Sequence, residues 1–482
     1  MGNKTVKSGK RVDTTPFDRH REPPRQNFFL MPLIHLACFV LTRGFWLRVT
    51  RRRMRGLKPP FLVLATHHAF MDFYVTPLAL FPHRANYVSE LEGFENFGEW
   101  IYRQIGCLGT RKFIHDFALI RNIRRVIERG DILVLYPEAR YANVGTNSQL
   151  DISVAKLAKK LGAPVVTLQM RGNYLQSPIW NLKKRRGVRL EAEIEQVFTR
   201  EELRVATGDE ILERLQEKLS YDEYAYQYES GMIINAPWRA EGLDAVLYRC
   251  PSCNREFAMR SRGARLFCES CGSAWTMTEL GRLRPERQGG GEEAAARGTV
   301  DSPHLSASQG EKEPVEPPRP PNPPDTCAPL KPLASGEVHI PDWYEWQRAA
   351  VEREIDAGRY SLDCAVEIES LPNAKNFIAL GRGRLRHDSD GFQLTFAPGG
   401  GADAPRTLSF APESMPSVHT EYDYRGKGQC ITLSVPDDTF FLYPHGDDAR
   451  RAFNVTKIQF AQEYFFRQYH GARQAISRPP SL

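Results

Sequence analysis

The sequence of 482 residues has no long hydrophobic segment, and its longest apolar run extends only from Phe28 to Leu41. A helix that crosses a lipid bilayer needs about 20 predominantly apolar residues. This run has 14 residues and contains Pro32 and His35. The short length of this run argues against a membrane-spanning helix and favours a helix that lies at the membrane surface or forms a re-entrant segment.

The sequence also lacks an export signal and a disulfide framework. The N-terminus has no apolar core followed by a small-residue cleavage site, so we expect no cleavable signal peptide. The nine cysteines are an odd number, and four of them form two Cys-x-x-Cys pairs. This usage is typical of a reducing compartment and argues against structural disulfides.

Net positive charge is confined to the N-terminal segment. The formal net charge is +7, whereas residues 1–60 alone carry 14 Lys and Arg against three acidic residues. An anionic partner is therefore expected only for this segment. The apolar run beside Arg51–Arg53 favours a membrane surface whose lipid phosphates meet the arginines. Nucleic acid is the alternative partner, and a helix that simply packs on the following domain is compatible with both.

The composition predicts a multidomain chain. We expect residues 1–25 to be a disordered basic arm and residues 26–235 to form an α/β domain with an N-terminal membrane-associating helix. Residues 245–283 are predicted to form a small ribbon, and residues 284–337 a disordered Gly- and Pro-rich linker. Residues 338–475 are predicted to form a mostly β domain with a C-terminal helix.

Strands and helices alternate in the first large domain. The pattern predicts strands at 61–64, 84–88, 131–136 and 163–170, and helices at 117–129, 154–161 and 201–219. Such alternation is typical of an α/β domain whose functional residues lie on the loops at strand ends.

An imidazole and a carboxylate follow the first of these strands at a spacing of five residues, as His67 and Asp72. If the chain folds back at this junction, the carboxylate can hold one ring nitrogen while the other nitrogen faces a substrate hydroxyl. The alternative is a surface histidine with an unrelated helical aspartate.

Two arginines lie near other strand ends. Arg111 follows a Gly-containing turn, and Pro137-Glu138-Ala139-Arg140 follows a buried strand. Two arginines and a histidine at one end of a sheet would form a phosphate site beside a general base. Taken singly, each arginine is more often a surface salt-bridge partner.

The order of these blocks, with Ala163-Pro164-Val165-Val166 after them, resembles the glycerolipid acyltransferase family over about residues 30–220. The family comprises the lysophosphatidic acid (1-acylglycerol-3-phosphate) acyltransferases. The resemblance implies that His67 is the general base and that Asp72 orients it. It further implies that Arg111, Glu138 and Arg140 bind the acceptor.

The implied reaction is an O-acyl transfer at the cytoplasmic face of a membrane, by a peripheral or re-entrant protein. A fatty acyl group would move from acyl-CoA or acyl carrier protein to a hydroxyl of a lysophospholipid-like acceptor of the 1-acylglycerol-3-phosphate type. Thr66 and Ala69 depart from the usual Asn and Ser, and Arg140 comes one residue early. These departures leave open a non-catalytic membrane- or lipid-binding scaffold built on a degenerate acyltransferase fold.

Four cysteines form the most specific motif. Cys250 and Cys253 make one knuckle and Cys268 and Cys271 a second one, with 14 residues between the knuckles. This spacing predicts a zinc ribbon, and four thiolates leave no open coordination position, so the zinc is expected to be structural. We expect the ribbon to bind a protein or a lipid in preference to nucleic acid, because the basic segment is remote in sequence.

The C-terminal part shows six or seven short strand patterns and a helix at 449–469. This succession resembles a pleckstrin-homology-type barrel in architecture alone. Such a domain binds a lipid headgroup, a peptide or its own neighbouring domain, and the last is the default expectation.

Overall fold

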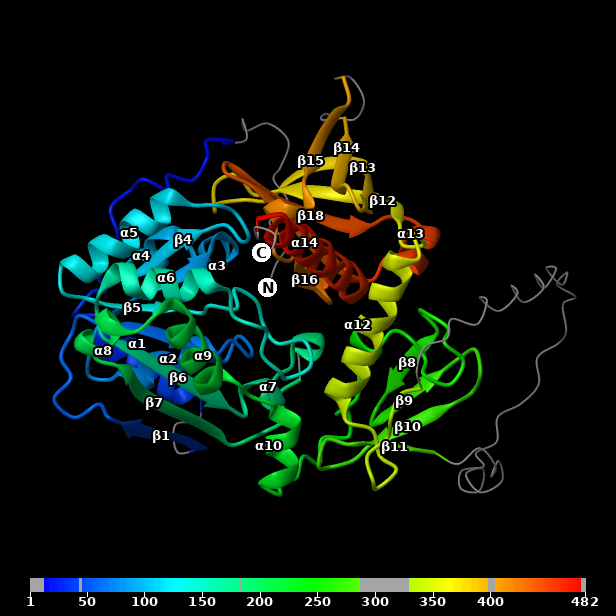
Figure 1. Cartoon of the computed structure of the whole chain (residues 1–482), viewed down its shortest axis with the longest axis horizontal. Helices are drawn as coiled ribbons and strands as arrows, with labels where there is room; N and C mark the ends of the chain where they lie inside the picture. Colours follow the sequence, from blue (N-terminus) through cyan, green and yellow to red (C-terminus); the bar gives the residue numbers. More distant parts are fainter. Residues whose placement is uncertain (1–12, 43–45, 183, 287–328, 398–403, 478–482) are drawn as a thin grey trace, which may run out of the picture.

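The computed structural model describes residues 13–42, 46–182, 184–286, 329–397 and 404–477. Figure 1 shows an α/β domain on the left, a small ribbon at the lower right and a C-terminal β domain at the upper right, with α14 crossing the middle. The multidomain arrangement that the sequence predicts is therefore present.

The α/β domain contains a seven-stranded sheet in the order β1-β7-β6-β2-β5-β3-β4. Its strands are β1 (Leu47–Arg52), β2 (Leu62–Ala65), β3 (Ala85–Glu90), β4 (Cys107–Thr110), β5 (Ile132–Leu135), β6 (Val165–Arg171) and β7 (Leu190–Phe198). Strands β6, β2, β5, β3 and β4 are mutually parallel, while β7 runs antiparallel to β6 and β1 runs parallel to β7. The carboxyl ends of the five central strands therefore share one edge of the sheet.

The central strands form where the sequence is continuously apolar. All four residues of β2 are buried, as is typical of a parallel strand covered on both faces. Strand β1 was not predicted, because its arginines had been interpreted as a lipid-binding cluster. Arg51, Arg52 and the following Arg53 also make contacts within the protein: Arg51 donates to the Ala79 carbonyl, Arg52 pairs with Glu193, and Arg53 pairs with Glu202.

The helices of the α/β domain are α1 (Met31–Leu41), α2 (Asp72–Leu80), α3 (Leu91–Phe97), α4 (Glu99–Gln104), α5 (Phe117–Glu128), α6 (Ile152–Leu161), α7 (Asn173–Gln176), α8 (Arg200–Val205), α9 (Gly208–Leu219), α10 (Glu223–Glu229) and α11 (Leu243–Val246). The helix predicted at 201–219 is divided in two. Thr199 and Thr207 each begin a helix with a capping box, and this double N-cap explains the division.

Residues 13–25 were expected to be disordered, and the structure corrects this for the part it describes. This segment runs across the α/β and C-terminal domains. Asn86 donates to the Pro24 carbonyl at 2.7 Å, and Arg25 pairs with Asp131 at 3.2 Å. A Cβ at Gly109 would lie 2.8 Å from the Phe17 ring, so glycine allows this close packing. Residues 1–12 lie outside the described residues.

The ribbon has four antiparallel strands in the order β11-β10-β9-β8. They are β8 (Met259–Arg262), β9 (Arg265–Cys268), β10 (Ala274–Met277) and β11 (Leu283–Pro285). The predicted linker at 284–337 is too wide at both ends, because Arg284 and Pro285 belong to β11 and Arg284 pairs with Glu337. Its central part, 287–328, lies outside the described residues. Helix α12 (Ile340–Asp356) follows.

The C-terminal domain is an antiparallel sheet in the order β15-β14-β13-β12-β18-β17-β16. Its elements are β12 (Leu362–Ser370), β13 (Ile378–Asp388), β14 (Gly391–Phe396), β15 (Arg406–Phe410), β16 (His419–Glu421), β17 (Cys430–Val435), β18 (Asp438–Pro444), α13 (Asp447–Ala452) and α14 (Val455–Ser477). The mostly β prediction with a terminal helix is confirmed. The pleckstrin-homology-type barrel stays a prediction.

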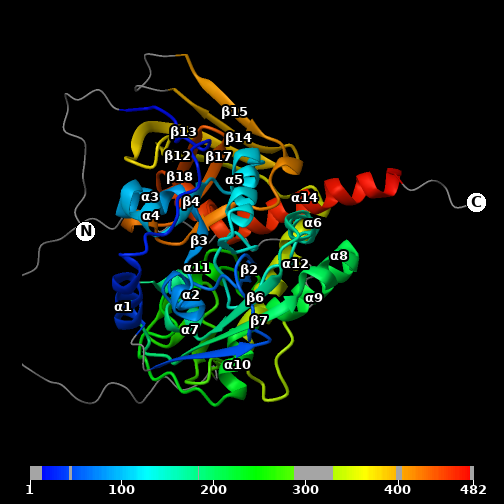
Figure 2. The same cartoon turned by 90° about the vertical axis from the view of Figure 1, so that its left-hand side faces the viewer.

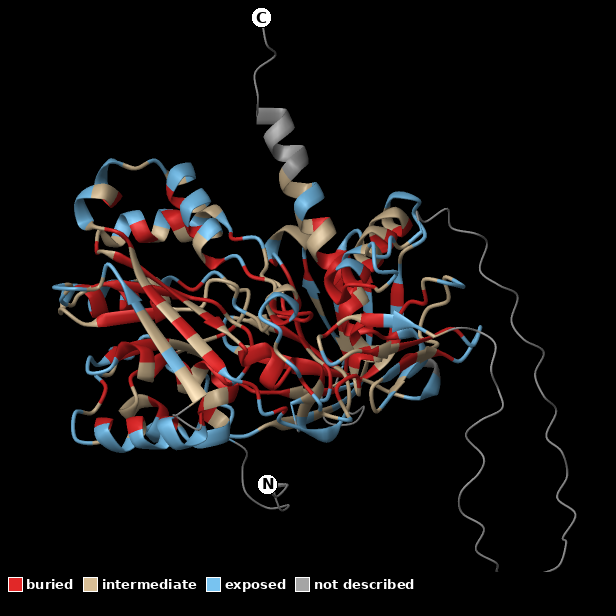
Figure 3. Cartoon of the chain, turned by 90° about the horizontal axis from the view of Figure 1, so that it is seen from below, coloured by how far each residue is buried: buried red, intermediate tan, exposed pale blue. Residues whose placement is uncertain are grey.

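Buried side chains of the α/β domain and the C-terminal domain pack together. Leu371, Phe441 and Tyr443 of the C-terminal domain belong to the same apolar cluster as Phe61 and Val63 of the α/β domain. Figure 3 shows buried residues continuing from one domain into the other. The C-terminal domain is therefore packed against the α/β domain, which was the default expectation.

Candidate active site and metal site

Residues with acid, base or hydrogen-bonding side chains lie at the carboxyl ends of the parallel strands, along one edge of the sheet. His67 follows β2, Arg111 follows β4, Glu138 follows β5 and Asn173 follows β6. Because the strands are parallel, side chains that are remote in sequence gather where the strands end. This edge is the candidate active site.

His67 and Asp72 form the pair that their spacing predicts. Nδ1 of His67 lies 3.2 Å from Oδ2 of Asp72. The same oxygen accepts the backbone N–H groups of His68 at 2.6 Å and Ala69 at 3.1 Å. Asp72 is the first residue of α2, so the turn between β2 and α2 folds back onto its own carboxylate. The local chain therefore fixes the carboxylate that orients the imidazole.

The His67 ring lies between two tyrosines. Its centroid is 4.3 Å from that of Tyr136, in a stacked arrangement, and 4.5 Å from that of Tyr141. Tyr136 is itself held by a 2.8 Å hydrogen bond to the Thr76 hydroxyl. The His67 side chain keeps 18% of its surface exposed, and among the described residues its Nε2 has no hydrogen-bond partner. This nitrogen is in position to accept a proton from a substrate.

His68, the residue after His67, has a different environment. The His68 side chain is fully buried, with its ring centroid 3.9 Å from that of Tyr221. Burial lowers the pKa of His68 to about 4, so its ring is neutral at pH 7. Its Nδ1 lies 3.8 Å from Glu223, whose pKa burial raises to about 8. Both side chains are fully buried, and the pair carries little charge at neutral pH.

Glu138 lies next to the dyad. Its Oε1 accepts the backbone N–H of His67 at 3.4 Å and the Tyr221 hydroxyl at 3.3 Å, while Oε2 accepts the backbone N–H of Ser148 at 2.7 Å. Burial raises the pKa of Glu138 to about 7. The prediction placed Glu138 in the acceptor site, and the structure places it beside His67.

Arg111 lies at the same edge but is bound by the C-terminal domain. Its two terminal nitrogens donate to the carbonyl oxygens of Leu371, Pro372 and Asp437 and to the Thr439 hydroxyl, at 2.8 to 3.1 Å. Its Nε is buried without a partner. The structure therefore does not direct Arg111 toward the dyad.

Arg140 is bound in a similar way. Its Nε and one terminal nitrogen donate to Ser148, and the other terminal nitrogen donates to Ser417 and to the Glu463 carboxylate of α14. The preceding Ala139 has a φ of 54°, in the left-handed region that favours glycine. After this turn, Arg140 extends to the C-terminal domain.

Asn173 was not predicted as a site residue. It is fully buried, and its amide donates to Oδ1 of Asp72 at 2.7 Å. Its position three residues after the predicted strand 163–170, near a strand end, is the signal that could have identified it. With Asn173 included, both carboxylate oxygens of Asp72 have hydrogen-bond donors.

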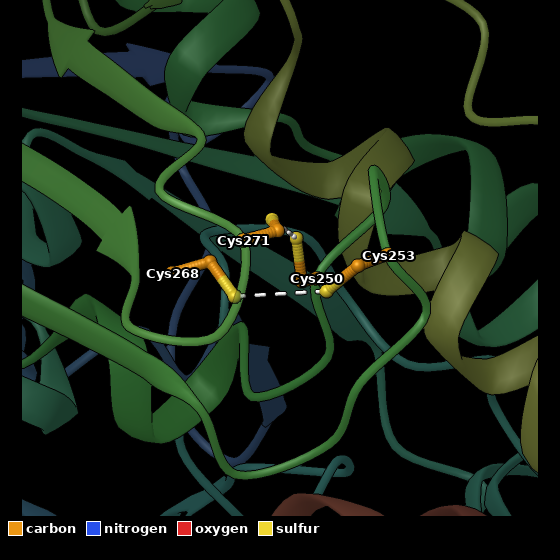
Figure 4. Close-up of side chains that lie close together, drawn as sticks. All are labelled: Cys250, Cys253, Cys268 and Cys271. Carbon is orange, nitrogen blue, oxygen red and sulfur yellow. Dashed lines mark hydrogen bonds between the residues drawn. The ribbon is translucent and has the colours of Figure 1, made fainter. Parts of the chain in front are cut away.

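The four predicted zinc ligands lie together, as Figure 4 shows. Their sulfur atoms all lie within 4.8 Å of one another. The Sγ atoms of Cys250 and Cys271 are 3.7 Å apart, as are those of Cys253 and Cys268. A zinc–sulfur distance of about 2.3 Å requires tetrahedron edges of about 3.8 Å, whereas a disulfide bond measures about 2.05 Å. The cluster therefore fits a tetrahedral metal ion.

The described residues contain no helix that is long and apolar enough to span a membrane. Helix α1 is the predicted membrane-associating helix. Its Leu33, Leu36 and Val40 side chains are exposed, whereas His35 and Cys38 are buried. Figure 2 shows α1 beside α2 on the left of the molecule.

Comparison with known proteins bears directly on this site. Residues 47–171 match the Acyltransferase family model. This segment is an acyltransferase-family domain. It contains His67, Asp72, Arg111, Glu138 and Arg140.

Among solved structures, the chain is similar to the 1-acyl-sn-glycerophosphate acyltransferase PlsC from Thermotoga maritima. The sequence identity is 16% and the TM-score 0.33, and the match covers 40% of this chain and 77% of that one. The chain is also similar to an SsgA-like sporulation-specific cell division protein from Thermobifida fusca, at 19% identity and a TM-score of 0.15 over 24% and 96% of the two chains. SsgB from Streptomyces coelicolor matches at 19% identity and a TM-score of 0.14 over 23% and 88%. No curated protein matches the chain.

Proposed function

We propose that this protein is an O-acyltransferase that moves a fatty acyl group from acyl-CoA or acyl carrier protein to a hydroxyl of a lysophospholipid-like lipid. The 3.2 Å contact between His67 and Asp72, within an acyltransferase-family segment, carries the proposal. The motif order by itself suggests an acceptor of the 1-acylglycerol-3-phosphate type, whereas the contacts of Arg111 and Arg140 with the C-terminal domain do not support a phosphate-binding role for these arginines.

In the proposed reaction, Nε2 of His67 takes the proton of the acceptor hydroxyl as its oxygen attacks the thioester carbonyl. Asp72 stabilises the imidazolium that forms. The backbone N–H groups of Phe70 and Met71, at the start of α2, are the candidate donors to the oxyanion. The carbon–sulfur bond then breaks, and the imidazolium returns the proton to the departing thiolate. The products are an ester and a free thiol.

The reaction is tested with purified full-length protein, labelled oleoyl-CoA or oleoyl carrier protein, and a panel of lysolipids. We expect His67→Ala to reduce turnover by about 10²- to 10⁴-fold, because a positioned general base contributes about that much. His83→Ala removes an exposed histidine and serves as the control. Equal turnover by the parent and His67→Ala on every acylated acceptor would contradict the mechanism.

One observation favours a second function, a non-catalytic lipid-binding scaffold. The C-terminal domain binds both Arg111 and Arg140, which the family resemblance assigns to the acceptor. This alternative predicts no acyl transfer by the parent with any donor or acceptor. It also predicts that Asp72→Asn binds vesicles as well as the parent does.

We propose a membrane surface as the partner of α1, at the cytoplasmic face where acyl thioesters are available. Exposed Leu33 and Leu36 would insert at the headgroup boundary. The double change Leu33→Glu and Leu36→Glu should reduce flotation with anionic vesicles. Val205→Glu changes an exposed residue of α8 and is the control. Equal flotation of both variants with the parent would contradict the proposal.

We propose that Cys250, Cys253, Cys268 and Cys271 hold one structural zinc ion, which takes no part in acyl transfer. Metal analysis should find one zinc per chain, and Cys253→Ser should lose it. A chelator should lower the thermal unfolding midpoint. A chain that retains full stability and contains no metal would contradict this assignment.

A further inference from the structure

The C-terminal domain uses nearly all the hydrogen-bonding capacity of Arg111. A guanidinium group has five N–H donors. Four of them point to oxygens of Leu371, Pro372, Asp437 and Thr439. The fifth, on Nε, is buried. A phosphate oxygen could therefore bind Arg111 only by displacing these oxygens, three of which are buried or part-buried backbone carbonyls.

Arg140 is also unavailable, for an electrostatic reason. Its guanidinium contacts the Glu463 carboxylate, and the two side chains are only 14% and 13% exposed. Glu463 also accepts a hydrogen bond from Arg348 at 2.5 Å, and Arg348 pairs with Glu345. Two arginines thus face two carboxylates, so the cluster has no net positive charge to offer a phosphate.

The remaining basic side chain after β4 is Lys112, and it is paired as well. Its ammonium group contacts the Glu90 carboxylate and lies 3.0 Å from Nδ1 of His419. His419 in turn lies 3.2 Å from Glu421. Arg111, Lys112 and Arg140 are therefore all engaged, and Lys112 and Arg140 are engaged by carboxylates.

Apart from Asp72, the groups that contact His67 are acidic or neutral. They are the carboxyl group of Glu138 and the rings of Tyr136 and Tyr141. Carboxyl and phenol groups bind neutral hydroxyls well, whereas a dianionic phosphate beside Asp72 and Glu138 would be repelled.

We infer that the acceptor of this enzyme is a lipid alcohol without a phosphate monoester, and that the C-terminal domain sets this selectivity by occupying Arg111 and Arg140. The inference rests on the proposed acyl transfer and narrows its acceptor. A phosphate monoester needs uncompensated basic groups, preferably a bidentate arginine. Glu463 and the carbonyls around Arg111 withhold both arginines from that role.

The decisive comparison uses acceptors with one acyl chain and different polar groups. The full chain is assayed with 1-oleoylglycerol, 1-oleoylglycerophosphocholine and 1-oleoylglycerol-3-phosphate, each with oleoyl-CoA and oleoyl carrier protein. We expect kcat/KM for one of the first two to exceed that for the phosphate monoester by about tenfold or more. A preference for the monoester overturns the inference and leaves the acyltransferase intact. No transfer to any acceptor overturns the proposed function itself.

The role of the C-terminal domain is tested by releasing Arg140. Glu463→Gln keeps the shape of the side chain and removes its charge, and we expect it to raise kcat/KM for the monoester several-fold relative to 1-oleoylglycerol. Glu345→Gln is the matched control, because Glu345 pairs with Arg348 and has no contact with Arg140. An equal increase for all acceptors would show a general inhibitory cover and overturn the selectivity role, as would an unchanged ratio.

Ser417→Ala is the milder variant if Glu463→Gln does not fold. It removes one hydrogen bond to Arg140 and one to Glu463. We expect the same change of acceptor ratio with a smaller magnitude. No change of ratio in a folded Ser417→Ala protein would count against the inference.

Discussion

Two groups of residues at one sheet edge are held by different parts of the chain. Asp72 binds the backbone of His68 and Ala69, within four residues of its own position. Arg111 binds the Leu371 carbonyl, 260 residues away, and Arg140 binds Glu463. The dyad is thus built by local chain geometry, while the arginines are positioned by a separate domain. The difference indicates that the proposed catalytic pair and the proposed acceptor site can vary independently of each other.

The largest expected effect is on the locally built dyad. Asp72→Asn should lower kcat by about 10²- to 10⁴-fold, because the amide no longer stabilises the imidazolium. Steady-state kinetics measure kcat, and thermal unfolding measures the stability of the variant. Asp209→Asn changes an exposed acid in α9 and should leave both unchanged. A near-normal kcat for Asp72→Asn would contradict the role in catalysis that is proposed for Asp72.

The next effect is on stability and concerns Arg111. Arg111→Met should lower the free energy of unfolding by about 3 kcal/mol, since it leaves buried carbonyl oxygens without donors. Urea unfolding measures the loss. Arg124→Met breaks an exposed pair with Glu128 and should cost about 0.5 kcal/mol or less. If the two variants were equally stable, the interface around Arg111 would be weaker than its hydrogen bonds indicate.

The next effect is the pH dependence of stability that comes from the ion pairs of Glu463 with Arg140 and Arg348. Burial alone would raise the pKa of Glu463, but Arg140 and Arg348 hold it at about 2, against an ordinary 4.5. A lowered carboxyl pKa gives stability that is present above about pH 4.5 and is lost as the pH falls toward about 2. The loss amounts to about 3 kcal/mol.

Urea unfolding between pH 2 and pH 6 tests this dependence. The parent should lose the stated stability on the acid side, whereas Glu463→Gln should be less stable at pH 6 and vary less with pH. Glu352→Gln serves as the control, because Glu352 pairs with a different arginine, Arg467 of α14. An identical pH dependence in parent and Glu463→Gln would contradict the ion-pair assignment.

The smallest effect lies at the turn between Glu138 and Arg140. Ala139→Gly should raise the free energy of unfolding by about 0.5 to 1 kcal/mol, because glycine adopts a φ of 54° without steric cost. Ala206 has a φ of −64°, so Ala206→Gly should give no increase. A stability decrease in Ala139→Gly would mean that the alanine side chain contributes packing that exceeds the strain.

The sequence predicted most central strands because their apolar runs are continuous. Strands β2, β5 and β6 and helices α5 and α6 lie within a few residues of their predicted positions. Strand β16, with three residues, is too short to give a pattern. Strand β1 was missed because its arginines and exposed residues hide the alternation, and only pairing with β7 defines it as a strand.

The sequence alone determined the groups that depend on short spacings. His67 and Asp72 are five residues apart, and each Cys-x-x-Cys pair spans four, so local backbone geometry brings their side chains together. The tertiary structure alone decided which oxygens bind Arg111 and Arg140, and it added Asn173 to the dyad. Those contacts join residues about 100 to 320 positions apart, and spacing along the chain carries no information about such pairs because only packing of separate elements creates them.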